Sequence, residues 1–588
     1  MRIGVIRERD AKPRARKPLV VAVLSISSAV AVAQVPPDLP KERPDAGRVL
    51  EQTREPLRLP APAPEDIAPR PPEPRPALPV SPTLKVRVKQ FNFSGNTLYT
   101  DEHLREVVAE FLGKELDFEA LTDAATKVRT FLRQRGYFLA QAYLPQQTIR
   151  GGVVEIAIVE GRVGELELQR RPATRLAEWL LAGIVGAHLK TGDIITEAGL
   201  EKPLLLINDL PTASVTSEIR PSNTVGAADL RVNVDKGAGL VNGFIDFDNH
   251  GSRFTGEYRL GASLNVNNPL GIGDQLTTRL FGTNEEMFFG RMAYLLPVTF
   301  YGTRLGVSLA KFEYRLAKDF ESLNAHGEGL VKSVFAFHPV YRTRNTNLIA
   351  QIAYEDKRLL DRIETQNSIE DRFLDSVKAG FVGDFRDRFF GGGLNAFSAT
   401  YTHGDLKIAP TDLAARDVDP VTGPQTLGTF RKWNYDYKRL NRVTDNASLL
   451  IAFSGQQASK NLASAERMSL GGPNGVRAYP VGEANGDTGM LLTAEARYIV
   501  PGWKLFEGDV SVWGHYDWGQ VDVREKPLPT EVSANKRRLS GAGFGGSLGQ
   551  EGRFIARASL SWPISDEEPQ ADKKKREPRI WMQAVKWF

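Results

Sequence analysis

The residues with the most specific chemistry lie in a loop-like stretch at positions 471–480, Gly-Gly-Pro-Asn-Gly-Val-Arg-Ala-Tyr-Pro. Glycine and proline interrupt regular structure at both ends, yet the centre is largely apolar around one arginine, which is unusual for a solvated loop. An arginine in such surroundings needs an anion partner if it is buried, because an unpaired buried charge is costly. The stretch therefore predicts an ion pair with a carboxylate elsewhere in the chain. The candidate loop residues are Val476, Arg477, Ala478 and Tyr479.

Asp517 is the candidate partner for Arg477. Between 510 and 520, apolar residues at even positions alternate with a polar set at odd positions that includes Asp517. A strand with this pattern turns Asp517 toward its polar face. A bidentate pair between Arg477 and Asp517 would hold the loop tip against that face. The alternative is that Arg477 is a surface loop residue and that Asp517 is one charge among many.

Two motif matches could indicate catalysis or nucleotide binding. Residues 545–549 match the pattern of a nucleophile elbow, and residues 541–546 match G-x-G-x-x-G. The two overlap in one glycine-rich segment with no helix signal after it, so neither has its required context. The seven histidines are scattered without metal-ligand spacing, and the chain has no cysteine, which excludes disulfides and thiolate sites. We therefore predict no enzyme activity, no cofactor and no metal site.

The positive charge of the chain is concentrated at its N-terminus. The formal net charge is +5, and the first 33 residues alone carry seven Lys or Arg against two acids. This basic segment contains an apolar run at 19–32 and ends in small residues, Ala31 and Ala33, where signal peptidase reads them. Residues 1–33 are therefore predicted to be a secretory signal peptide, with an uncleaved membrane anchor as the alternative. Because the remainder is neutral, nucleic acid is not an expected partner.

Residues 34–84 precede the first globular pattern. Within the region 34–56, residues 45–55 have a composition that allows a short helix, whereas residues 57–84 are dense in proline. A helix on a semi-rigid proline-rich linker is a movable part. The alternative interpretation is disorder without a role.

From residue 85 the pattern becomes globular, in two successive segments at 85–161 and 162–236. Each has the order strand, helix, helix, strand, strand, with Thr100 as the first expected helix N-cap. A small α+β module of this kind exposes sheet edges, which can accept an extended polypeptide as an added strand. We expect the modules to bind an unfolded polypeptide, whereas the alternative is that they are spacers. The expected strands lie at 85–93, 138–144, 153–159, 163–168, 213–220 and 228–234, and three of the helices at 118–136, 175–185 and 196–208.

The last segment, 237–588, consists of short runs in which apolar and polar residues alternate. In 255–266, for example, Leu260 and Leu264 fall on one face and Arg259 on the other. Such different faces require lipid on one side and water on the other, and only a closed barrel satisfies every backbone group in lipid. A soluble β-sandwich is the alternative. No stretch after the leader reaches the roughly 18 apolar residues of a spanning helix. Similar alternation is found at 347–355, 492–498 and 553–562.

Three short sequence motifs resemble those of a known family. Phe-Ser-Gly-Asn-Thr at 93–97, Gly-Tyr-Phe-Leu-Ala-Gln-Ala-Tyr-Leu-Pro at 136–145 and Val-Glu-Gly-Arg-Val at 159–163 are similar to those of the two-partner secretion transporters. This TpsB family, of haemolysin and haemagglutinin secretion-activation type, belongs to the Omp85 superfamily. The resemblance covers nearly all of the mature chain. It implies a β-dominated membrane protein with an N-terminal plug helix, two POTRA domains and a C-terminal transmembrane β-barrel of 16 strands.

The resemblance also assigns residues. In this family the sixth extracellular loop carries Val-Arg-Gly-Tyr or Phe and folds into the barrel, so Ala478 departs from the usual glycine. Tyr-Asp-Trp-Gly at 516–519 resembles the lumen motif whose aspartate meets the loop arginine, which implicates Asp517 and Gly519. Phe588 resembles the terminal aromatic that the barrel-assembly machinery recognises. Lys586 stands where an aromatic or aliphatic residue is usual. The resemblance therefore does not determine which face of the last strand points into the barrel.

The function implied by the resemblance is translocation across the outer membrane of a Gram-negative bacterium. The POTRA domains would lie in the periplasm and bind an unfolded cognate exoprotein, which would pass through the barrel without ATP. Outer-membrane lipid and the barrel-assembly machinery are the other expected partners. A barrel-assembly insertase of the same superfamily and, from another class, a passive solute porin are the alternatives.

Overall fold

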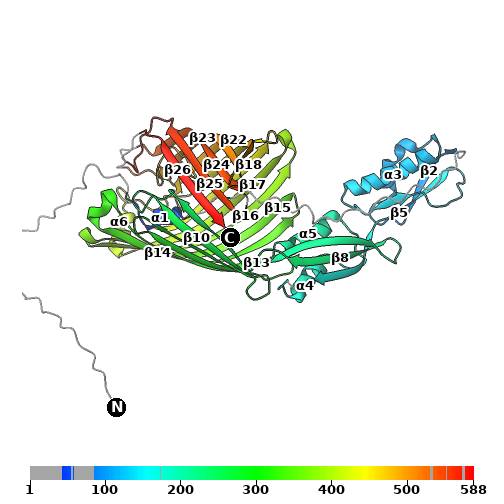
Figure 1. The fold of residues 1–588 in the computed structure, drawn as a ribbon, viewed down its shortest axis with the longest axis horizontal. Coiled ribbons are helices and arrows are strands. Elements are labelled where there is room, and N and C mark those ends of the chain that lie inside the picture. The colour runs from blue at the N-terminus through cyan, green and yellow to red at the C-terminus, as the bar shows by residue number, and fades with distance from the viewer. Residues whose placement is uncertain are drawn as a thin grey trace, which may run out of the picture. The chain divides into compact units, whose positions relative to one another are not determined.

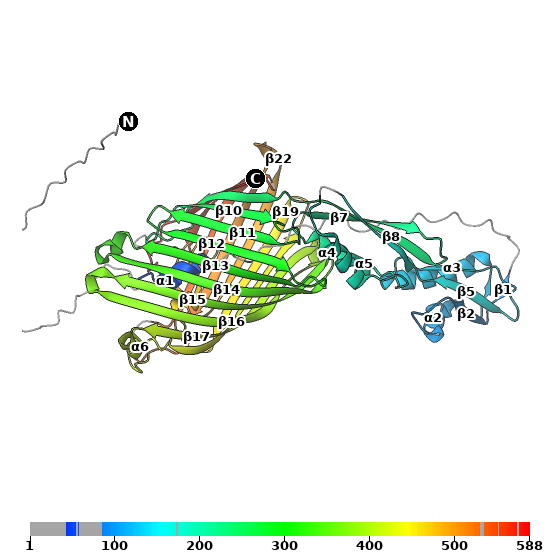
Figure 2. The same ribbon diagram turned by 90° about the horizontal axis from the view of Figure 1, so that it is seen from below.

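The structure is a computed structural model of the 588-residue chain. The predicted signal peptide at 1–33, with Ala31 and Ala33, and almost all of the predicted linker lie outside the described residues. Figures 1 and 2 show two small α+β modules and a large barrel. The structure describes residues 43–53, 57, 85–171, 174–529, 534–550, 552–572 and 576–588.

The first module contains a three-stranded sheet in the order β2-β5-β4, in which β2 and β5 are parallel. The single strand expected at 85–93 is wrong, because the chain breaks after Arg87 and its first part pairs with β3 instead of the sheet. β5 has the predicted bounds, whereas β4 is shorter than the predicted 138–144. The elements are β1 (Val86–Arg87), β2 (Gln90–Ser94), α2 (Asp101–Val107), η2 (Ala109–Phe111), β3 (Glu115–Leu116), α3 (Phe118–Gln134), β4 (Gln141–Tyr143) and β5 (Val153–Val159).

Helix α3 provides most of the helical contribution to the core of this module. The Asp117 side chain caps the helix by accepting a hydrogen bond from the Ala120 N–H at 2.8 Å. Leu121, Val128 and Leu132 repeat on one face, and all three are buried in one cluster with the sheet. The side chains that the helical periodicity places on one face therefore form part of the packed core.

The second module repeats the first. Its sheet has the order β6-β8-β7, with β6 and β8 parallel and β7 and β8 antiparallel. Helix α4 begins later than the helix expected at 175–185, and α5 follows the N-cap residue Thr196 as its periodicity predicts. The elements are β6 (Arg162–Arg170), α4 (Glu178–His188), α5 (Glu197–Asn208), β7 (Ala213–Pro221) and β8 (Ala227–Lys236).

The C-terminal segment forms a closed antiparallel barrel of 16 strands, in which β26 pairs with β9. The predicted fold class is confirmed. In chain order the strands are β9 (Val241–Asp248), β10 (Arg259–Asn267), β11 (Gln275–Thr283), β12 (Phe288–Pro297), β13 (Arg304–Arg315), β14 (Ala325–Arg342), β15 (Thr346–Ile363), β16 (Ser368–Asp387), β17 (Gly393–Ala409), β18 (Gly428–Arg442), β19 (Ala447–Ala458), β22 (Thr488–Leu505), β23 (Gly508–Asp522), β24 (Lys536–Gln550), β25 (Phe554–Pro563) and β26 (Arg579–Trp587).

The two faces of the wall have opposite chemistry. Leu260 and Leu264 are exposed on the outer face, as the alternation predicts. Inside, Asp246 accepts hydrogen bonds from Arg279 at 2.5 and 2.9 Å. An apolar outer face and paired charges within are what a lipid-embedded wall around a wet interior requires.

No helix among the described residues is long and apolar enough to cross a membrane. The short connecting elements between barrel strands are η3 (Lys318–Leu323), η4 (Glu364–Gln366), η5 (Phe389–Gly391), α6 (Thr411–Asp417), η6 (Ser464–Glu466), β20 (Met468–Ser469) and β21 (Asn485–Gly486).

The α3 core residue Leu121 provides a test of the first module. Leu121→Ala should destabilise this module by about 2–5 kcal/mol, because the substitution removes a buried side chain and leaves a cavity. Proteolysis of the full-length protein across a urea series should show earlier cleavage within 85–161. Asp123→Ala, on the exposed side of the same helix, is the control and should leave the cleavage midpoint unchanged.

Candidate functional site

The segment between β19 and β22, here called the inward loop (residues 459–487), folds against the inner faces of several barrel strands. Val476, Ala478 and Tyr479 are fully buried, in one cluster with wall residues of β22, β23 and β24. The short strands β20 and β21 pair with each other and close the base of the loop. The sequence stretch around Arg477 therefore lies inside the barrel.

Arg477 binds two carboxylates of the wall. Its Nε donates to Oδ2 of Asp517 and its Nη2 to Oδ1, each at 2.9 Å, which is a bidentate pair. Its Nη1 donates to Oε2 of Glu495 at 2.8 Å, and its backbone N–H donates to Asp517 at 3.1 Å. The structure thus brings Arg477 and Asp517 together and adds a second acid, Glu495, for which the sequence predicted no partner.

Wall residues orient both members of this pair. The Thr493 hydroxyl donates to Oδ1 of Asp517 at 3.0 Å. Trp581 on β26 donates its indole N–H to the carbonyl oxygen of Arg477 at 2.7 Å. Trp581 is 8% exposed and faces inward, whereas Phe588 lies on the exposed face of the last strand with Lys586. The contact of Trp581 with the loop therefore determines which face of the last strand points into the barrel.

Small residues of the wall make room for the loop. A β-carbon at position 541 would lie 2.4 Å from the Cβ of Ala478, and one at position 519 would lie 2.8 Å from Cδ2 of Leu470. Ala478 is not among the residues with positive φ, so the alanine introduces no backbone strain. Gly541 therefore leaves space for the methyl group of Ala478. Gly519 lets Leu470 pack closely against the wall.

Tyr479 connects the loop to the segment between β25 and β26. Its hydroxyl lies 2.8 Å from Oγ of Ser565 and donates to the carbonyl oxygen of Glu567 at 2.9 Å. Its ring is buried with Val476 in the cluster described above. The motif residues therefore contact two parts of the barrel, through Arg477 on one side and Tyr479 on the other.

Three further charge sets hold the inward loop. Glu466 pairs with Lys357 of β15 and with Lys432 of β18, the latter at 2.8 Å, although all three side chains are buried. Within the loop, Arg467 pairs with Asp487 at 3.0 Å. Sequence reasoning missed these pairs, because charges in an expected loop look solvated until the loop is known to fold inward. Arg537 of β24 also pairs with the buried Glu483 at 2.7 Å.

Helix α1 (Ala46–Glu51) packs against the inward loop. Asp45 caps the helix by accepting a hydrogen bond from the Arg48 N–H at 3.0 Å, and it also accepts one from Ser464 at 2.8 Å. A β-carbon at Gly47 would lie 2.2 Å from Oγ of Ser464 and 2.5 Å from the backbone nitrogen of Ala465. The helix is shorter than the expected 45–55, and its contact with the loop depends on the absence of a side chain at position 47.

The same helix is bound to the barrel wall. The Ala46 N–H donates to Oδ1 of Asp361 at 2.9 Å, and Arg372 donates to Asp45 at 2.9 Å. Tyr314 of β13 also donates to Asp361. Asp361 of the wall therefore accepts a hydrogen bond from the first turn of the helix. The positive charge of Arg372 compensates the negative charges of Asp45 and Asp361.

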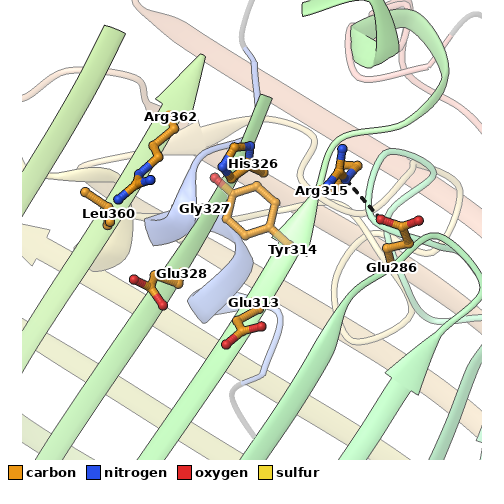
Figure 3. Close-up of a pocket in the computed structure, with 9 residues that line it drawn as sticks. All are labelled: Glu286, Glu313, Tyr314, Arg315, His326, Gly327, Glu328, Leu360 and Arg362. Carbon is orange, nitrogen blue, oxygen red and sulfur yellow. Dashed lines mark ion pairs between the residues drawn. The ribbon is translucent and has the colours of Figure 1, made fainter. Parts of the chain in front are cut away.

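A cavity of about 380 Å³ lies over β13, β14 and β15 beside this contact. Figure 3 shows Tyr314 next to Gly327, with Glu313 and Glu328 on the neighbouring strand positions and α1 behind the strands. A β-carbon at Gly327 would lie 2.8 Å from the Tyr314 hydroxyl. The glycine therefore leaves the space in which Tyr314 reaches Asp361. Among the described residues, no group of His, Cys, Asp and Glu is arranged to hold a metal ion.

The geometry defines a class of protein: an outer-membrane barrel whose interior holds its own inward loop and N-terminal helix, preceded by two POTRA-type modules. The profile of the haemolysin secretion/activation protein family ShlB/FhaC/HecB matches residues 226–548, and that of the ShlB-type POTRA domain matches residues 86–161. The chain belongs to this family. It is an outer-membrane secretion transporter with its POTRA domains in the periplasm, it acts with a cognate exoprotein, and it is not an enzyme.

Named relatives agree with this assignment. The chain is 28% identical over 506 residues to the heme/hemopexin transporter protein HuxB of Haemophilus influenzae, covering 85% of this chain and 86% of that protein. It is 25% identical over 495 residues to the outer membrane transporter CdiB of Dickeya dadantii, covering 81% and 83%. The solved CdiB of Escherichia coli has the same fold, with a TM-score of 0.70 at 20% identity over 89% of this chain and 94% of that one.

The contact between Ala478 and Gly541 predicts a reciprocal pair of substitutions. Gly541→Ala should displace the loop tip and weaken the Arg477 pair, because the two β-carbons cannot share the space. Adding Ala478→Gly should restore the native packing. The measurement is the temperature at which the folded barrel loses its fast electrophoretic migration. A double variant no better than Gly541→Ala alone would contradict the contact.

The contact at Gly47 predicts an effect on closure of the pore. Gly47→Val should release helix α1 from the loop, because its added carbon would meet both a side chain and the backbone. Single-channel conductance in planar bilayers should rise toward that of a variant lacking residues 34–56. The matched control is Gln52→Ala at the C-terminal end of the same helix, which should conduct like the wild type.

Proposed function

We propose that the inward loop and helix α1 form one closing unit of the secretion pore, which the arriving exoprotein opens by displacing the helix. The observation that supports this proposal is the shared contact at Ser464 and Ala465, where α1 meets the loop inside the barrel. Helix α1 is six residues long, whereas the inward loop is joined to a barrel strand at each end, to β19 and to β22. The helix is therefore the part that leaves, and the loop is the part that stays.

The proposed role of the Arg477 clamp is to keep the loop tip on the wall while the cargo passes. Removing one partner of a buried pair costs about 3–5 kcal/mol, because the other charge is left without compensation. The chain adds a second acid, Glu495, and a backbone N–H to the pair. A tip held in this way would not follow the helix out of the lumen. Val476 and Tyr479 are proposed as its packing partners.

The POTRA domains are proposed to receive the unfolded exoprotein at their open sheet edges. Strands β2 and β4 are the edges of the first sheet, and β6 and β7 those of the second. An extended segment could add to such an edge through main-chain hydrogen bonds. Folding of the exoprotein outside the cell would then prevent its return, since folding removes the unfolded chain from the equilibrium.

We propose two further partners. Outer-membrane lipid would cover the apolar outer face, and the barrel-assembly machinery would read the terminal Phe588. A barrel-assembly insertase is the weaker candidate, because such proteins usually carry more POTRA modules. A passive porin would conduct equally with and without residues 34–56, so the conductance comparison separates it from a plugged secretion pore.

Charge reversal at the clamp is the direct test of the proposed function. Arg477→Asp and Asp517→Arg should each abolish release of the cognate exoprotein into the medium. The double reversal should restore release only in part, because the new acid at position 477 would face Glu495. Adding Glu495→Gln should improve it further.

The control for this series is Arg431→Asp, on an exposed side chain of β18. It should secrete like the wild type, and every variant must show the fast electrophoretic migration of a folded barrel. Normal secretion by Arg477→Asp would show that the clamp is dispensable. Loss of the exoprotein signal without this protein, and its return on complementation, tests the secretion role itself.

A further inference from the structure

The hairpin between β22 and β23 extends beyond the rim of the barrel at its periplasmic end. Strand β22 pairs with β19 as far as Tyr498, and one further hydrogen bond joins the Ile499 N–H to the carbonyl oxygen of Asn446 at 2.8 Å. From residue 500 to Leu505, the strand has no partner on that side among the described residues. In Figure 2 the end of β22 projects outward from the body of the barrel.

Two irregularities shape this hairpin. Between Ile499 and Lys504 the register shifts, because β22 advances five residues while β23 moves two, from Ser511 to Asp509. Residues 500–503 therefore stand opposite Val510 alone and form a bulge, and a bulge bends a strand away from its neighbours. The tip consists of Phe506 and Glu507, with φ values of 51° and 64°. Positive φ at both central residues is what a two-residue hairpin turn of type I′ requires, and residues other than glycine adopt it at some cost.

The hairpin exposes large apolar side chains. Trp503, Leu505 and Phe506 are 68%, 53% and 78% exposed, more than the lipid-facing Tyr498 and Tyr516 at 44% and 43%. A soluble surface rarely gathers such residues without a partner. Residues 501–507 are exposed throughout, so the patch adjoins the lipid-facing Tyr498 along the same strand. Aromatic side chains at the ends of the apolar band are typical of the membrane interface.

We propose that residues 500–507 anchor the barrel in the glycerophospholipid headgroup layer of the periplasmic leaflet, with Trp503 and Phe506 inserted. The direction of the hairpin supports lipid over the exoprotein, since it projects away from the lumen. Pro501 also supports this choice, because it has no N–H to offer on the free edge, where an extended polypeptide would add. The anchor is therefore a lipid contact.

The charges of the hairpin are paired within the protein. Glu507 pairs with Arg553 at 2.7 Å, and Lys504 lies 3.8 Å from Asp509. No excess charge is left to attract anionic lipid. Insertion is therefore apolar, and it should occur equally in vesicles of phosphatidylcholine and in vesicles that contain phosphatidylglycerol.

The absence of cysteine allows a direct test with single-cysteine variants of the full chain. Phe506→Cys and Trp503→Cys, each labelled with nitrobenzoxadiazole, should show a blue-shifted emission in phosphatidylcholine vesicles. Lipid carrying a spin label near the headgroup should remove most of that emission. Tyr516→Cys on the outer wall is the positive control. Asp445→Cys, in the neighbouring exposed turn, should report water and resist quenching.

Several outcomes would overturn the proposal. If labels at both 503 and 506 behave like the label at 445, the hairpin does not enter the bilayer. If they become shielded only when unfolded exoprotein is added, the patch is a polypeptide site. If shielding requires phosphatidylglycerol, the contact is electrostatic and not apolar. Using two labelled positions guards against disturbance of the strained tip by the cysteine at 506.

Discussion

The constraint on which the rest of the structure depends is that lipid offers no partner for a backbone N–H or carbonyl group. The chain meets it by closing sixteen strands, with β26 pairing back to β9. Closure creates an interior separated from the bilayer, and alternation along each strand lines that interior with charged side chains. The inward loop and helix α1 can occupy it only because the wall supplies partners for their charges.

The charged groups inside the barrel are arranged in sets in which opposite charges compensate each other. Arg477 meets two acids, Glu466 meets two lysines, and Asp361 receives Arg372 as well as the first turn of α1. Buried ion pairs contribute little net stability, because desolvation offsets most of the attraction. Their effect is on position, since a displaced loop would leave several buried charges unpaired at once. The inward loop is therefore held in one place on the wall.

Close packing is the second factor that fixes the position of the inward loop. Gly47, Gly519 and Gly541 each face a neighbour that would collide with an added β-carbon. The helix contact at Gly47 involves the loop itself, so movement of either part changes the surface available to the other. The inward loop is joined to barrel strands at both ends, whereas α1 is a separate helix of six residues, so the two parts can move independently.

Much of this organisation could be predicted from the sequence. Alternation of apolar and polar residues determines the lipid-facing and inner faces of the strands, and helical periodicity determines α3 and α5, because both are local consequences of backbone geometry. The number of strands and the membership of the family came from short motifs. The break between β1 and β2 was not predicted, because Val86 and Val88 continue the alternation of one strand while their hydrogen-bond partners lie far along the chain.

The partners inside the barrel were decided only by the tertiary structure. Arg477 required an anion, and alternation pointed to Asp517, but Glu495 and the contact between Trp581 and the loop depend on how neighbouring strands align. The same holds for Gly541, which accommodates Ala478, and for the outward hairpin at Trp503. A sequence determines which side chains share a face, because that follows from a period of two. It does not determine which faces meet across an enclosed space, because that follows from closure of the whole barrel.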